Sequence, residues 1–150
     1  MKHATACGFA LSSIVHATED STKVLSALSN LFPPGFSKRF EITTAKGHFG
    51  NEIKIFSMKA RGISHAESFL KSVLGRLSRG DRLSLREGFD LHLDHSGRLH
   101  LRFDKQEAFN GLLVLGSRDA IKAEVSFESR GTPSSLLREK VARDLKELLS

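Results

Sequence analysis

The most constraining feature of the chain is an alternation of apolar and polar residues on either side of a short turn. Between residues 89 and 93, and again between 99 and 103, every second residue is Leu or Phe. Such alternation is typical of a β-strand with one buried face. The intervening His95-Ser96-Gly97 has the composition of a three-residue hairpin loop with glycine in the left-handed position. The pattern therefore predicts a β-hairpin over 89–103.

The predicted register of this hairpin gives each strand a buried and an exposed face. On the inner face it pairs apolar residues: Leu93 with Leu99, Leu91 with Leu101, and Phe89 with Phe103. On the outer face it pairs polar residues: Asp94 with Arg98, His92 with His100, and Asp90 with Arg102. Opposite charges meet twice, which supports the register, and a shift of one residue would turn every leucine to solvent.

Similar patterns divide the rest of the chain into strands and helices. Alternation predicts further strands, over residues 6–17, 38–46, 52–60 and 121–128. Apolar stripes predict three main helices, the first after Thr18 as its cap, the second after the capping box Ser64-His65-Ala66-Glu67, and the third after Thr132-Pro133. Shorter pieces are a short helix or irregular connection at 79–88, a turn or short helix at 104–110 and a brief strand at 111–115.

These elements predict one α+β domain over residues 1–150, with about three main helices packed on a largely antiparallel sheet. The second predicted strand points Phe40 and Ile42 inward. No repeat, low-complexity segment or linker divides the sequence.

The charge of the chain favours an acidic partner. The sequence has 23 Lys and Arg against 17 Asp and Glu, a net charge of +6. Nucleic acid is the first expectation and an anionic membrane surface the second. Cys7 is the only cysteine, so no internal disulfide forms, and no apolar stretch is long enough to span a bilayer. We therefore expect a cytoplasmic protein.

Catalytic and metal-binding motifs are not evident in the sequence. No serine lies in a Gly-x-Ser-x-Gly turn, and no phosphate-binding loop is present. Asp90, His92, Asp94 and His100 could share one sheet face and hold a divalent ion, but the arginines paired with these aspartates would repel it. We expect neither enzymatic activity nor a metal or other cofactor.

Basic residues occur in three groups, around the second predicted strand, along the second helix and its exit, and on the hairpin. These groups are Lys38, Arg39 and Lys46; Arg76, Arg79, Arg82 and Arg86; and Arg98, Arg102 and Lys105. Such side chains neutralise backbone phosphates. The chain has no Trp or Tyr, so base stacking would use Phe36 or Phe49 from predicted loops.

Three polar segments mark the junctions between predicted elements. They are His16-Ala17-Thr18-Glu19-Asp20, Gly47-His48-Phe49-Gly50-Asn51 and Arg102-Phe103-Asp104-Lys105-Gln106. In order and spacing they resemble an archaeal family described as RNA-binding proteins or predicted exosome subunits. The resemblance covers most of the chain. It implies a single domain similar to the ribosomal protein that contacts 5S rRNA, and self-association into a homodimer.

Together, charge and resemblance predict a non-enzymatic protein that binds structured RNA, as an accessory factor in RNA processing, exosome function or ribosome assembly. The alternative is a non-catalytic interaction module that docks an exosome or ribosomal protein. The candidate RNA-contacting residues are Lys38, Arg39, Lys46, His48, Phe49, Asn51, Arg102, Lys105 and Gln106. A second candidate cluster comprises His16, Thr18, Glu19, Asp20 and Asp104.

We expect the three segments to converge in space, with Lys105 and its neighbours forming an exposed polar cluster. The alternative for Thr18, Asn51 and Asp104 is that they only cap helices and close turns, as these residue types often do.

Overall fold

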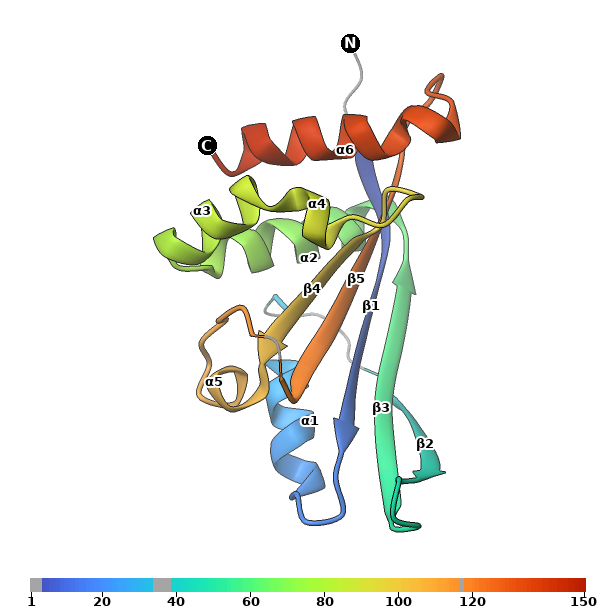
Figure 1. Ribbon diagram of the computed structural model, residues 1–150, viewed down its shortest axis with the longest axis vertical. Coiled ribbons are helices and arrows are strands. Elements are labelled where there is room, and N and C mark those ends of the chain that lie inside the picture. Colours follow the sequence, from blue (N-terminus) through green and yellow to red (C-terminus); the bar gives the residue numbers. More distant parts are fainter. Residues whose placement is uncertain (1–3, 34–38, 117) are drawn as a thin grey trace.

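The computed structural model describes residues 4–33, 39–116 and 118–150 and confirms the α+β fold. Five antiparallel strands form one sheet in the order β2-β3-β1-β5-β4 (Figure 1). In chain order the strands are β1 (Thr5–Val15), β2 (Glu41–Lys46), β3 (Glu52–Arg61), β4 (Leu99–Asp104) and β5 (Ala120–Glu128).

Helices cover one face of this sheet and one of its ends. They are α1 (Ser21–Ser29), α2 (Ile63–Arg76), α3 (Arg79–Glu87), α4 (Phe89–His92), α5 (Lys105–Phe109) and α6 (Ser134–Leu148). In Figure 1, α1 and α2 lie behind the sheet, α6 crosses its upper end, and the turn between β2 and β3 lies at the lower end. Within the described residues, no helix combines the length and apolar character that a membrane span requires.

The first strand, β1, lies at the centre of the sheet and pairs with β3 on one side and β5 on the other. Its inward residues Phe9, Leu11 and Val15 are buried. The ring of Phe9 stacks on that of Phe69 from α2, with the two centroids 4.2 Å apart. A β-bulge between Ala6 and Gly8 shifts the pairing with β5 by one residue. The buried core therefore lies between this face and the helices.

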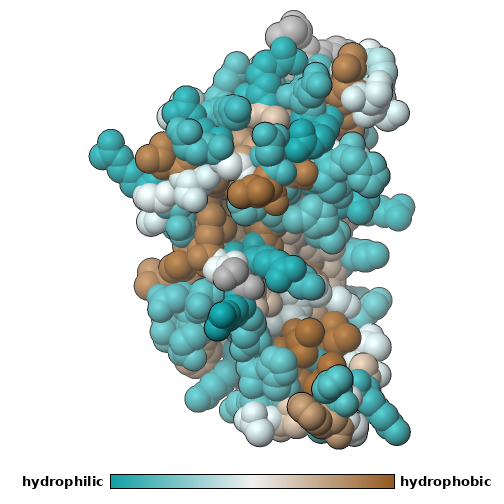
Figure 2. All heavy atoms as spheres, viewed as in Figure 1, coloured by the Kyte–Doolittle hydropathy of each residue, from teal (hydrophilic) through white to brown (hydrophobic). Residues whose placement is uncertain are grey.

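The opposite, outer face of the sheet carries polar side chains along its middle, with the paired Ile14 and Ile55 as apolar neighbours toward the β2–β3 turn. The strand registers align one residue from each strand across this face, a set that we call the outer row: Glu41, Ser57, Ser12, Lys122 and Arg102. The serines at its centre are half-buried, whereas the two ends of the row are exposed. Figure 2 shows mostly hydrophilic side chains in this view, with smaller hydrophobic groups between them.

The predicted hairpin is wrong in its first strand. Residues 89–92 form the short helix α4, and of the predicted pairs only the two next to the turn remain, Leu93 with Leu99 and Asp94 with Arg98. Leu91 is 88% exposed and does not face Leu101. The free edge of β4 is instead used by residues 115–116, since Leu115 bridges Phe103 and the Gly116 N–H donates to the Arg102 carbonyl.

The predicted turn of that hairpin is confirmed. Gly97 has a φ of 84°, which favours glycine. The Asp94 carboxylate accepts hydrogen bonds from the backbone N–H groups of Ser96 and Arg98 and lies 2.9 Å from His100 Nε2. The outer-face pairs of His92 with His100 and of Asp90 with Arg102 are not formed. The His92 ring instead lies 3.2 Å from the His100 carbonyl oxygen.

The helix caps differ from those predicted. Asp20, and not Thr18, caps α1 by accepting a hydrogen bond from the Thr22 N–H. The second helix begins at Ile63 after Gly62, which has no side chain to cap it, and the Glu67 carboxylate of the predicted capping box accepts instead from the Ala6 N–H of β1. The last helix begins at Ser134, also without a side-chain cap.

The remaining short segments are resolved as follows. Residues 79–87 form the regular helix α3, so the domain has one more main helix than predicted, and α5 confirms the short helix within 104–110. The predicted strand at 111–115 reduces to the single bridge of Leu115. Ile42 points to the inner face as predicted, since it pairs with the buried Phe56, but at the sheet edge it is 62% exposed, whereas Phe40 is partly buried against the core.

The burial of Leu101 and the exposure of Leu91 give a paired test of this arrangement. Leu101→Ala should lower the free energy of unfolding by about 2–5 kcal/mol, because it removes buried methyl groups and leaves a cavity. Leu91→Ala should change it by less than about 0.5 kcal/mol. Urea unfolding of both variants measures the difference. Equal losses would restore the predicted hairpin and contradict the helix α4.

The carboxylate of Asp94 should make stability depend on acid pH. Desolvation acts to raise the pKa of Asp94, but hydrogen bonds from His100, Arg98 and Ser96 outweigh it and hold this pKa well below its ordinary value. A depressed native pKa contributes stability above the unfolded value of about 3.9, and this is lost as the pH falls through the native value. Asp94→Asn should therefore cost about 1 kcal/mol at pH 7, a modest figure because solvent screens the site.

The same variant should lose less stability than the wild type between about pH 5 and pH 2, because it has no carboxylate to protonate. Asp90→Asn is the control, since Asp90 is exposed and bonded only to Arg138 among the described residues. Urea unfolding across this pH range provides the measurement. Parallel curves for wild type and Asp94→Asn would show that the turn carboxylate does not contribute.

Candidate nucleic-acid interface

Two cations meet at one end of the outer row. Arg102 of β4 and Lys122 of β5 are directly opposite one another, and both are exposed. Like charges at opposed positions of neighbouring strands are destabilising. Within the described residues, the Lys and Arg side chains that form ion pairs are Lys105 and Arg138, so this pair has no carboxylate partner. The site therefore holds positive charge that the fold itself does not neutralise.

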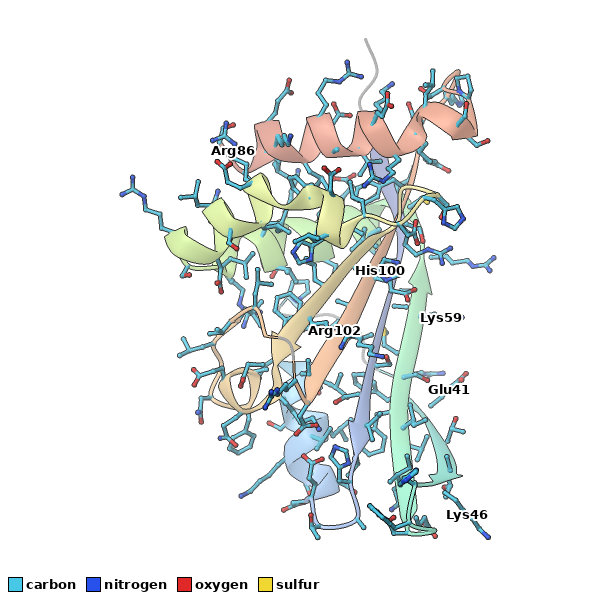
Figure 3. All side chains as sticks on the ribbon, viewed as in Figure 1. Glu41, Lys46, Lys59, Arg86, His100 and Arg102 are labelled. Atoms are coloured by element: carbon cyan, nitrogen blue, oxygen red, sulfur yellow. The ribbon has the colours of Figure 1, made fainter. Side chains whose placement is uncertain are left out.

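A groove of about 540 Å³ runs beside this pair of cations. Its floor is formed by β4 and β5, and its walls by α4 and residues 115–116. The polar side chains that line it are His92, His100, Arg102, Lys122 and Glu124. Figure 3 places His100 and Arg102 along β4 in this view, with Lys59 of β3 farther across the sheet. The groove is a concave surface in which fixed positive charge exceeds negative charge.

The turn between β2 and β3 presents an exposed aromatic side chain. Phe49 is 91% exposed, and its ring centroid lies 5.0 Å from that of His48 in an edge-on arrangement. The turn is closed by a hydrogen bond from the Gly47 N–H to the Asn51 carbonyl oxygen. Lys46 is exposed at the start of this turn (Figure 3). An aromatic ring held in solvent by an ordered turn is available for stacking.

Two further predicted cations flank this hairpin on the side that precedes β2. Arg39 is exposed directly before the strand. Lys38, with Phe36, lies outside the residues that the structure describes.

Lys105 is not exposed, which corrects the prediction of an exposed polar cluster. Only 7% of the residue is accessible. Its Nζ donates to the Ile14 carbonyl oxygen at 2.7 Å, to Asp119 Oδ1 at 2.8 Å and to both carboxylate oxygens of Glu19 at 3.1 and 3.2 Å. All three N–H bonds of the ammonium group are thus directed at protein acceptors. Lys105 is held by these groups and is not free to bind phosphate.

Around Lys105, two of the three polar segments converge. His16 Nε2 lies 3.1 Å from Asp119 Oδ1, and Thr18, Asp20, Asp104 and Gln106 line a pocket of about 400 Å³ next to the buried ammonium. The segment with Asn51 does not line this pocket. It forms the β2–β3 turn at the same end of the sheet (Figure 1).

Several residues of these segments have structural roles. The Asp104 carboxylate caps α5 by accepting from the Glu107 N–H, as Asp20 caps α1. Asp119 has a φ of 42°, a left-handed conformation that is unfavourable for a residue other than glycine. Desolvation acts to raise the pKa of Asp119, but the hydrogen bonds and charges of Lys105 and His16 outweigh it and lower this pKa below its ordinary value. The ion pair with Lys105 thus holds Asp119 in place despite its backbone strain.

The same cluster could also be interpreted as a metal-binding site. Ligand atoms of His16, Glu19 and Asp119 lie within 4.8 Å of one another. However, the Lys105 ammonium already contacts both carboxylates and supplies the positive charge. The donor set therefore fits an internal cation better than a metal ion.

Lys122 is the functional candidate that the sequence reasoning missed. Alternation places it on the outer face of its strand, but an outward lysine is common. Its significance comes from the pairing of β4 with β5, which brings it beside Arg102. The predicted hairpin had instead paired Arg102 with Asp90, which would have neutralised it.

Comparison with known proteins adds a family to this geometry. Residues 10–127 match the model of a family described as RNA binding. The chain is 35% identical over 119 residues to "RNA-binding protein PAB1135" of Pyrococcus abyssi, covering 77% of each chain. It is 33% identical over 123 residues to the uncharacterized protein MJ0213 of Methanocaldococcus jannaschii, covering 79% of this chain and 82% of that one.

Solved structures show the same fold. The crystal structure of protein AF2318 from Archaeglobus fulgidus, a DUF54 protein, superposes with a TM-score of 0.80 at 30% identity and covers 95% of this chain and 99% of its own. The range matched by the family model contains the whole outer row and the β2–β3 turn but not α6.

Replacement of Lys105 tests its structural role. Lys105→Met should lower the free energy of unfolding by about 2 kcal/mol, because it leaves two carboxylates and a carbonyl without their donor. This is below the loss for a fully buried pair, since the Asp119 side chain is 53% exposed and can be rehydrated. Guanidinium unfolding measures the loss, with Lys23→Met as the control, because Lys23 is exposed on the same pocket. If Lys105→Met is as stable as the wild type, Lys105 does not have this structural role and is again a candidate for binding phosphate.

Proposed function

Because the chain belongs to the family described as RNA binding, we propose that it binds RNA on the outer face of its sheet. The observation that carries this proposal is the opposed pair Arg102 and Lys122, two exposed cations that no described carboxylate neutralises. An RNA phosphate placed between them would relieve their repulsion. Binding at this position therefore removes an electrostatic repulsion that destabilises the free protein.

The groove beside the pair favours a nucleic-acid strand over a small anion. It extends from α4 along β4 and β5, and its polar lining offers imidazole and guanidinium donors to phosphate and sugar oxygens. Lys59 continues the positive charge across the sheet toward β2 (Figure 3). The contacts available here are to the backbone, so this part of the interface gives affinity without much sequence preference.

The β2–β3 turn would supply the contact to bases. Phe49 is the exposed aromatic ring at its tip, with His48 beside it and Lys46 at its base. Bases in single-stranded loops can stack on such rings, which contributes about 1–3 kcal/mol per base. This combination fits a structured RNA that presents an unpaired loop or end.

We further propose that the protein is a non-enzymatic accessory factor in RNA processing, exosome function or ribosome assembly. Support for binding over catalysis comes from the site itself. The acidic and histidine side chains near the groove are engaged structurally, Asp94 in its turn and His92 with the His100 carbonyl.

A double substitution in the outer row tests the RNA site. Arg102→Gln/Lys122→Gln should weaken binding to a structured RNA about tenfold at low salt, because two phosphate contacts are lost. The slope of log K against log salt should fall by about 1.4, at 0.7 for each contact to a single strand. Thermal stability should stay the same or rise, since the repulsion between the two cations is removed. Fluorescence anisotropy at several salt concentrations measures both quantities.

The matched control is Lys71→Gln/Arg130→Gln, which removes the same charge from α2 and from the loop before α6, both exposed. It should bind RNA nearly as the wild type does. If both double variants lose affinity equally, binding is only a response to net charge and the outer-row site is wrong. If the wild type binds no RNA, the proposed function itself fails.

A further inference from the structure

A second basic surface lies next to α4, between α3 and the second half of α6. Two hollows of about 490 and 470 Å³ meet there, and both are lined by Arg86 and Ser150. We call the joined hollows the α3–α6 groove. Figure 3 labels Arg86 between the two helices, at the opposite end from Lys46.

Five cations from the two helices line this groove in addition to Arg138, which pairs with Asp90. Arg79, Arg82 and Arg86 are spaced three and four residues apart, which places them on one side of α3 at steps of about 5–6 Å between Cβ atoms. Arg143 and Lys146 line the facing side from α6. The acidic residues in the groove are Asp90, Glu139 and Glu147, and Asp90 is already paired with Arg138.

These five cations have no structural role that explains them. Within the described residues, none of them forms an ion pair, since those of Lys and Arg belong to Lys105 and Arg138. Most are exposed, and Arg82 is half-buried. A concentration of arginine on one side of a short helix, opposite further cations, raises the local electrostatic potential and disfavours the free state.

We propose that the α3–α6 groove is a second RNA site, which binds the phosphate backbone of a duplex region. This rests on the proposed function and extends it from one surface to two. Four of the five cations are arginines, whose guanidinium groups donate two parallel hydrogen bonds to a phosphate. Among the described residues, none that lines the groove is aromatic, which suits backbone contacts to paired RNA more than recognition of single-stranded bases.

The position of the α3–α6 groove determines how long an RNA must be to contact both sites. The groove beside the outer row and the α3–α6 groove are adjacent at α4, since Leu91 and His92 line the first and Asp90 lines the second. Figure 3 sets Arg86 well apart from Arg102, so a short oligonucleotide bound at the Arg102–Lys122 pair leaves the arginines of α3 unoccupied. A longer stem–loop can place its loop on the sheet face and its stem in the groove. The α6 half of the groove also lies outside residues 10–127, so the family match does not account for it.

The test compares three double variants on two RNAs: Arg86→Gln/Arg143→Gln in the groove, Arg102→Gln/Lys122→Gln in the outer row, and the control Lys71→Gln/Arg130→Gln. The probes are a long stem–loop RNA and a short single-stranded oligonucleotide. The groove variant should bind the stem–loop about tenfold more weakly, with a salt slope lower by about 1.8, at 0.9 for each duplex contact. Its affinity for the short oligonucleotide should stay at the control value.

The outer-row variant should lose affinity for both probes, which separates the two sites. If the groove variant binds the stem–loop as the control does, the second site is wrong while RNA binding by the sheet stands. If the outer-row variant matches the control on both probes, or the wild type binds neither, the proposed function fails. Circular dichroism confirms folding, and the charge reversal Arg86→Glu should weaken stem–loop binding further than Arg86→Gln does.

Discussion

The longer helices pack on one face and one end of the five-stranded sheet, and most of the architecture follows from this one-sided burial. Each strand must alternate, with residues such as Phe9 and Leu11 turned to the helices and residues such as Ser12 turned away. The outer face has no core to bury and is free to carry charge. Arg102 and Lys122 can therefore lie side by side, because both are exposed to water. A second layer of helices would bury these two unpaired cations at a high cost in free energy.

A buried ammonium group connects the chain segments at one end of this sheet. Lys105 joins the end of β1 through the Ile14 carbonyl, the start of the first helical region through Glu19 and the approach to β5 through Asp119. The segment 14–19 and Asp119, which are about a hundred residues apart, are thereby fixed to one point. The polar residues there serve mainly the fold, whereas the cations of the outer row and the five cations named in the α3–α6 groove form no ion pair among the described residues.

The sequence predicted the fold class and most strands because burial of one face imposes alternation. The predicted strand at residues 89–93 was wrong because the same apolar pattern also fits one helical turn. Phe89 and Leu93 are four residues apart and both buried, whereas Leu91 between them is exposed. The burial of Lys105 could not be predicted either, since its partners at 19 and 119 are distant in sequence. The outer row likewise depends on the strand order, which local patterns do not contain.

The central position of β1 has a consequence for how the protein is made. Its pairing with β3 needs only the first sixty or so residues, but its partners in β5 lie more than a hundred residues farther along the chain. During synthesis the N–H and C=O groups at one edge of β1 therefore stay unpaired until β5, which ends at Glu128, has left the ribosome. Such delayed pairing slows folding and exposes a strand edge to other chains. We expect the nascent chain to depend on early burial of Phe9 against α2 to keep that edge from pairing elsewhere.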